Sequence, residues 1–73
     1  MARLWYTTEE AEGLIVNKDA CAGCRRIAAI EWLTRLQNAD YRSQVALSPK
    51  IAFQANLLRN ASDLPHTCKG QTT

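Results

Sequence analysis

Residues 19–38 read DACAGCRRIAAIEWLTRLQN and carry the clearest helical pattern in the chain. This stretch contains no proline and only one glycine, so little in it opposes a helix. Asp19 is a suitable N-cap residue. At about 100° per residue, one broad side of the helix is apolar and the opposite side is polar. The apolar side holds Ala29, Ile30, Trp32, Leu33 and Leu36, and the polar side holds Glu31, Thr34, Arg35 and Asn38. We therefore predict an amphipathic helix over residues 20–38.

A second helix is predicted over residues 48–61. Ser48 can cap it, and Pro49 occupies the first helical position, where a missing N–H costs nothing. The predicted apolar stripe combines Ile51, Ala55 and Leu58 with Phe53 and Leu57, which broaden it. The segment 39–47 between the two helices has room for one more helical turn.

The N-terminal segment allows two interpretations. Thr7 followed by Glu10 fits a capping box, which favours a short helix. The alternative is a β-hairpin formed by residues 3–8 and 13–17, because Trp5, Tyr6 and neighbouring apolar residues suit strands. We favour the helix. The predicted fold is thus a mainly α, small helical domain over residues 1–68, with a disordered tail over 69–73.

The composition indicates a thin core. The chain has 73 residues, of which 47% are hydrophobic, but that share includes 11 alanines and 3 cysteines. A domain of this size has a small margin of stability and often gains from a metal or a partner. The charge is unevenly distributed, with −2 over residues 1–16 and +4 over residues 17–73.

Cysteine and histidine form two close pairs, which indicate a structural zinc site. Thiolate and imidazole ligands in a Cys3His set suit tetrahedral zinc. The predicted ligands are Cys21, Cys24, His66 and Cys68. Zinc would tie the tail to the start of the 20–38 helix and so stabilise a fold that has few large apolar residues. The alternatives are buried thiols without a metal and Cys-x-x-Cys redox chemistry.

Two short stretches resemble known families. Gly13–Val16 followed by Cys21-Ala22-Gly23-Cys24 resembles the strand–Cys-x-x-Cys–helix segment of thioredoxins, over about a quarter of the chain. This resemblance implies thiol redox activity, but the later strands and the proline of that family have no counterpart here. Tyr6–Ala11 resembles the opening helix of excisionase-like winged-helix DNA binders over about ten residues, and we carry no function across from it.

The chain shows no signal-peptide core and no apolar run long enough to span a bilayer, which predicts a cytoplasmic protein that does not contact membranes. No acid–base or nucleophilic set is readable, so catalysis on a small-molecule substrate is not expected. Trp32 is expected in the core. Trp5 is also expected there, with the alternative that it is an exposed anchor.

We therefore predict a non-enzymatic regulator that binds a larger intracellular machine, with the transcription apparatus, RNA polymerase included, as the favoured partner. The alternative is a small zinc-stapled DNA-binding protein, for which Lys and Arg would contact phosphates. The predicted partner-binding residues are Arg3, Trp5, Arg25 and Arg26. A second region considered for the interface is the helix around Lys50 and Arg59.

Overall fold

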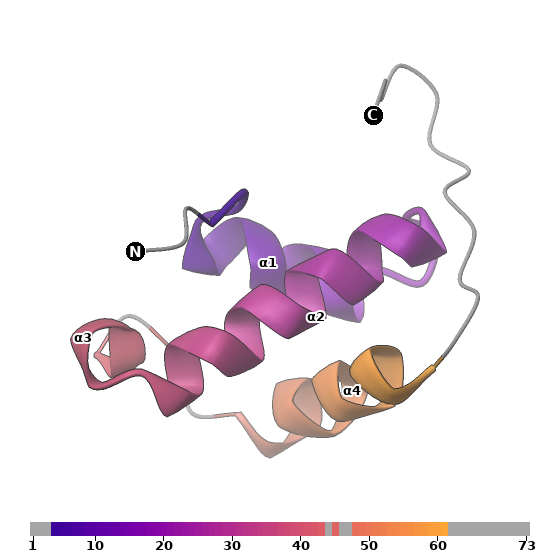
Figure 1. Cartoon of the computed structure of the whole chain (residues 1–73). Coiled ribbons are helices and arrows are strands. Elements are labelled where there is room, and N and C mark those ends of the chain that lie inside the picture. The colour runs from indigo at the N-terminus through magenta and orange to yellow at the C-terminus, as the bar shows by residue number, and fades with distance from the viewer. Residues whose placement is uncertain (1–3, 44, 46–47, 62–73) are drawn as a thin grey trace.

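The computed structural model describes residues 4–43, 45 and 48–61, which form four helices and no strand (Figure 1). These are α1 (Thr8–Val16), α2 (Ala22–Gln37), the short α3 (Ala39–Arg42) and α4 (Pro49–Asn60). Helix α2 is the centre of the arrangement, because it packs against α1, α3 and α4, and α1 and α4 also contact each other. The prediction of a mainly α domain is confirmed, and the hairpin alternative for the N-terminal segment is wrong.

Local hydrogen bonds explain where α1 and α4 begin. The Thr7 hydroxyl accepts from the Glu10 N–H at 3.1 Å, and the Thr7 N–H donates to the Glu10 carboxylate at 3.0 Å, which completes the predicted capping box. The Ser48 hydroxyl accepts from the Ile51 N–H at 3.4 Å at the start of α4. Both N-terminal boundaries therefore follow from the sequence.

The predicted N-cap of α2 is wrong. The helix begins at Ala22, and its N-cap is Cys21, which makes no capping hydrogen bond with its side chain. Asp19 belongs instead to the turn after α1, where its N–H donates to the Asn17 Oδ1 at 3.0 Å. This side-chain-to-backbone bond two residues apart stabilises a turn in competition with a helix start.

The core is narrow and rich in alanine. Trp32 and Ile15 are the largest fully buried side chains, which confirms the prediction for Trp32. The indole N–H of Trp32 donates to the Glu12 carboxylate at 3.0 Å, so its one polar atom is satisfied at the edge of the core. The buried cluster consists of Ala11, Ile15, Ala28, Ala29, Trp32, Leu33, Val45, Ala55 and Leu58. Small side chains at many of these positions let the helices approach closely.

Two expectations about helix faces are corrected. The side of α2 that was expected to be polar and exposed to solvent is partly covered, because Glu31 and Arg35 are buried, with exposed fractions of 6% and 5%. Helix α4 buries Ala55 and Leu58, but Phe53 and Leu57 are 62% and 51% exposed and do not broaden the buried stripe. In both cases the position of the neighbouring helices, which periodicity does not give, decides which side is covered.

Candidate protein-binding groove

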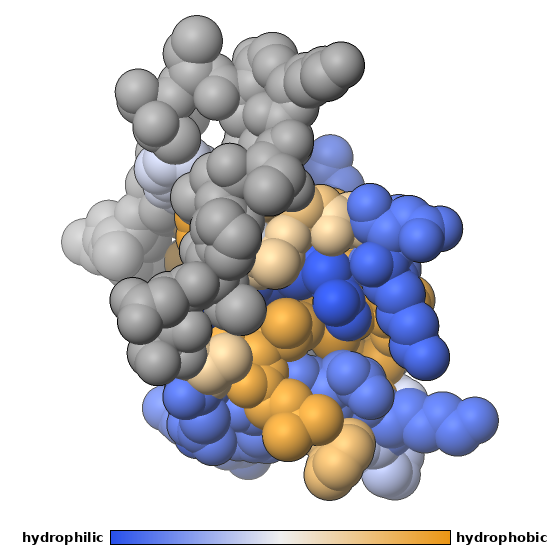
Figure 2. All heavy atoms as spheres, turned by 90° about the vertical axis from the view of Figure 1, so that its right-hand side faces the viewer, coloured by the Kyte–Doolittle hydropathy of each residue, from blue (hydrophilic) through white to orange (hydrophobic). Residues whose placement is uncertain are grey.

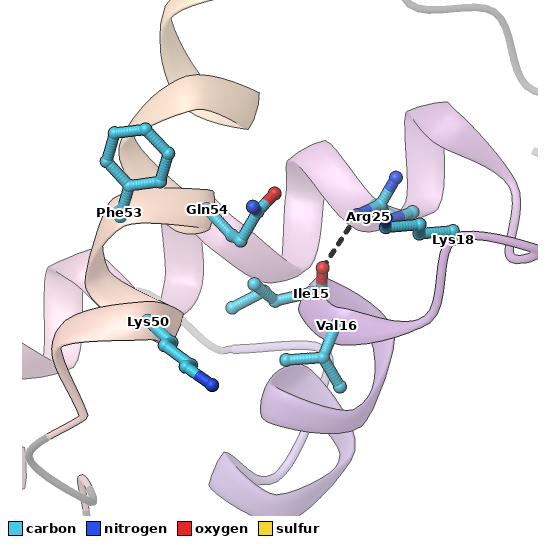
Figure 3. A pocket seen from close by; sticks show the side chains of 7 residues that line it. All are labelled: Ile15, Val16, Lys18, Arg25, Lys50, Phe53 and Gln54. Atoms are coloured by element: carbon cyan, nitrogen blue, oxygen red, sulfur yellow. Dashed lines mark hydrogen bonds between the residues drawn. The ribbon is translucent and has the colours of Figure 1, made fainter.

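A hollow of about 350 Å³ lies between the C-terminal end of α1 and the first turns of α4 (Figure 3). Helix α1 contributes its last residues, the α1–α2 turn and α2 contribute cationic side chains, and α4 forms the opposite wall. Its lining consists of Ile15, Val16, Lys18, Arg25, Lys50, Phe53 and Gln54. The hollow is therefore built where three helices meet.

Apolar side chains stand exposed around this hollow. Val16 ends α1 and is 54% exposed, and Phe53 on α4 is 62% exposed. Leu57 lies one helical turn beyond Phe53, which places the two side chains on the same face of α4. Viewed onto the end where α2 begins and α4 ends, apolar side chains form a strip between hydrophilic ones (Figure 2). We call Val16, Phe53 and Leu57 with the hollow the α1–α4 groove.

The charged residues that line the hollow have one sign. Three of its lining residues are cationic, namely Lys18, Arg25 and Lys50, and none is acidic. The sequence from residue 41 to residue 62 contains no Asp or Glu at all. In α1, Glu9 and Glu10 lie in the first turn, at the other end of that helix from the groove, whereas Asp19 follows Lys18 in the turn after α1. A ligand in the groove therefore meets positive charge beside apolar surface.

Arg25 and Arg26, two of the predicted partner-binding residues, hold helix ends together. The Arg25 guanidinium donates from Nε to the Leu14 carbonyl at 3.1 Å and from Nη2 to the Ile15 carbonyl at 2.7 Å. The Arg26 guanidinium donates from Nε to the Ala61 carbonyl at 3.0 Å and from Nη2 to the Arg59 carbonyl at 3.4 Å. The last carbonyls of a helix lack partners within the helix and favour cations. The two arginines thus attach α2 to the C-terminal ends of α1 and α4.

Trp5 is exposed, while the backbone beside it is firmly held. Its side chain is 69% exposed, so the core expectation for Trp5 is wrong and the alternative of an exposed residue holds. The backbone N–H groups of Trp5 and Tyr6 donate to the two oxygens of Glu31 at 2.8 and 2.9 Å, and Arg35 donates to the Tyr6 carbonyl. Arg3, the remaining predicted residue, lies outside the described residues.

The cysteine pair occupies the start of α2. Cys21 is half-buried and Cys24 is buried. Within the described residues, no group of three or more Cys, His, Asp or Glu side chains is placed to hold a metal. His66 and Cys68 lie outside these residues, so the zinc part of the predicted fold has no support here and stays a prediction. The strand expected from the thioredoxin resemblance is wrong, because Gly13–Val16 is the last turn of helix α1.

The groove offers binding groups and no acid–base pair. Its lining contains no carboxylate, imidazole or thiol, and the buried carboxylate of Glu31 accepts hydrogen bonds from the backbone elsewhere.

Comparison with family models, curated proteins and solved structures gives no match for this chain. Among the helices of the described residues, none combines the length and the apolar character that a membrane span requires.

Of the predicted partner-binding residues that the structure describes, Arg25 lines the hollow, whereas Trp5 and Arg26 do not; Lys50, from the second region considered, also lines it. Two features of the sequence point to the groove: the apolar pair Phe53 and Leu57 at a spacing of four residues, and the absence of acidic residues between 41 and 62. Neither feature distinguishes an exposed face from a buried one. That distinction requires the position of α1 relative to α4.

Proposed function

We propose that this protein is a non-enzymatic binding domain that docks on a larger protein through the α1–α4 groove. The observation that carries the proposal is the exposure of Val16 and Phe53 on the walls of a single hollow, with Leu57 exposed one turn further along α4. Large apolar side chains that gather on one surface, with polar groups at the rim, are typical of protein interaction sites. An aromatic residue such as Phe53 is also the kind of anchor on which binding free energy concentrates.

The transcription apparatus is the machine that we propose as the partner, on the basis of the acidic first segment and the basic body of the sequence. A zinc ion held by the two Cys/His pairs and a cytoplasmic location belong to the same proposal. Direct DNA binding receives less support, because Arg25 and Arg26 donate to backbone carbonyls of the chain itself. A phosphate would have to compete with those bonds.

Site-specific photo-crosslinking tests the proposal. The photoreactive residue benzoylphenylalanine is placed at Phe53 and, in the control, at Thr34, which is exposed on α2. After irradiation in a lysate treated with nuclease, the Phe53 position should yield a discrete protein adduct and the Thr34 position should not. Phe53→Gln should abolish capture of the same protein, whereas Gln37→Ala on the exposed side of α2 should retain it.

Two results would refute the proposal. One is equal crosslinking from Phe53 and Thr34, which would mean that the groove makes only random encounters. The other is capture that disappears on nuclease treatment and falls steeply with salt, which is the signature of phosphate contacts. Circular dichroism of each variant establishes that it is folded, and Phe53→Gln should preserve the fold because the side chain is exposed.

A further inference from the structure

We infer that the α1–α4 groove receives an acidic amphipathic helix of a protein partner. This inference rests on the proposed function and names the chemistry of the partner. An amphipathic helix presents apolar residues at spacings of three and four and fits an apolar hollow bounded by helices. The exposed side chains Val16, Phe53 and Leu57 supply the apolar contact surface for it.

The two lysines of the groove select the sign of the partner's charge. Lys18 lies in the turn after α1, and Lys50 extends from the first turn of α4 into the space between the helices (Figure 3). Within the described part of the chain, neither ammonium group has a hydrogen-bond or ion-pair partner. Carboxylates on the rim of a docked helix would therefore find unengaged cations. A basic helix would be repelled at the same positions.

Arg25 has a different role at this site. Its guanidinium already donates to the Leu14 and Ile15 carbonyls, so it neutralises the negative C-terminal end of α1. Without this cation, that end of the helix would repel an approaching carboxylate. The lysines thus contact the acidic partner, and the arginine makes the wall of the groove compatible with it.

Two acidic residues at the start of α1 affect where an acidic ligand can bind along this helix. Glu9 and Glu10 are exposed in the first turn of α1, at the opposite end from Val16. They repel an acidic ligand from that end of the helix and leave the groove end as the favourable position. Along α1, the charge distribution therefore favours the groove end for an acidic helix.

Three synthetic peptides of about 16 residues, roughly four helical turns, provide the test. They share leucines at helical spacing and carry glutamate, glutamine or lysine at the same flanking positions. Fluorescence anisotropy of the labelled peptides with the intact chain should give the order glutamate, glutamine, lysine, from tightest to weakest. The charge-reversal variant K18E/K50E should weaken the glutamate peptide about tenfold, the effect of about 0.7 kcal/mol per rim charge. The same variant should bind the lysine peptide better than the original chain does.

The outcomes separate this inference from the proposed function. It is overturned if the glutamate peptide does not bind at millimolar concentration, or if K18E/K50E leaves the order of the peptides unchanged. Crosslinking from Phe53 with no effect of K18E/K50E would retain protein docking and reject an acidic partner. Self-association that Phe53→Gln abolishes, seen by sedimentation, would also overturn the inference, because the occupant would then be a second copy.

Discussion

Replacement of Glu31 by alanine tests how the N-terminal segment is attached to the helices. Glu31 is 6% exposed, and its carboxylate accepts the backbone N–H groups of Trp5 at 2.8 Å and Tyr6 at 2.9 Å. Hydrogen bonds to a charged group contribute about 1.5–3 kcal/mol each. Because the released N–H groups can turn toward water, we expect Glu31→Ala to lower the free energy of unfolding by about 2–4 kcal/mol.

That loss is large for a domain of this size. A chain of 73 residues has an unfolding free energy of about 4–11 kcal/mol at the usual 0.05–0.15 kcal/mol per residue. At about 4–8 °C per kcal/mol, the melting temperature should fall by roughly 8–32 °C. Thermal and urea unfolding followed by circular dichroism give both quantities. Glu31→Gln keeps one acceptor oxygen and should lose about half as much.

Glu9→Ala is the matched control, because it removes the same charge from an exposed position in the first turn of α1. It should cost about 0.3–1 kcal/mol through the helix dipole alone. Amide hydrogen exchange provides an independent measure: Glu31→Ala should remove the protection of the Trp5 and Tyr6 amides, and Glu9→Ala should not. If the free energies of unfolding of Glu31→Ala and Glu9→Ala differ by less than about 0.5 kcal/mol, the reasoning about the buried carboxylate is refuted.

Three further predictions concern the two arginines of α2, Trp5 and the Cys/His pairs. Arg25→Ala and Arg26→Ala should each lower the free energy of unfolding by about 1–2 kcal/mol in urea unfolding, because each removes hydrogen bonds to carbonyls at the end of a helix. Trp5→Gln should leave the free energy of unfolding in urea almost unchanged, because the side chain is 69% exposed. A decrease of more than about 1 kcal/mol would assign the indole to the core. Elemental analysis of the purified chain should find one zinc per molecule, and substoichiometric metal would reject the site. Its predicted ligands are Cys21, Cys24, His66 and Cys68.

The helices were predictable because their boundaries depend on local chemistry. The capping box of Thr7 and Glu10 and the Ser48–Pro49 start of α4 act within a few residues, so the sequence contains the whole signal. The start of α2 was misplaced because Asp19 suits both a cap and a turn, and the Asn17 side chain decides between them. The additional turn considered for residues 39–47 is present as α3.

The candidate site was less predictable because it depends on tertiary packing. Phe53 and Leu57 have the same apolar character as the buried Leu58, and which of them is buried depends on how α1 and α2 pack against α4. Glu31 is buried for the converse reason: the segment before α1 returns to α2 and places two backbone donors on its carboxylate. Single-helix periodicity carries neither fact, because it describes one helix without its neighbours.

Arginine and lysine divide the positive charge of this chain between the fold and its surroundings. Arg25, Arg26, Arg35 and Arg42 each donate a hydrogen bond to a backbone carbonyl outside their own helix, whereas Arg59 donates to the Asn56 Oδ1 within α4. For Arg42, the acceptor is the Leu36 carbonyl near the end of α2, at 3.2 Å. The planar guanidinium suits this role because its several donors have a fixed geometry, whereas an ammonium group is a compact charge on a flexible stem.

This division changes what the net charge means. The excess of positive charge counted from the sequence suggests a surface for phosphates, but much of it lies on arginines that join helices across an alanine-rich core. Lys18 and Lys50 are the cations of the groove that make no such bond within the described residues. Two unengaged cations beside exposed apolar side chains suit an acidic protein surface better than the regular phosphates of a duplex, which require many cations along one face. Charge reversal at the lysines should therefore alter recognition without unfolding the chain, whereas charge reversal at Arg25 or Arg26 should destabilise the fold itself.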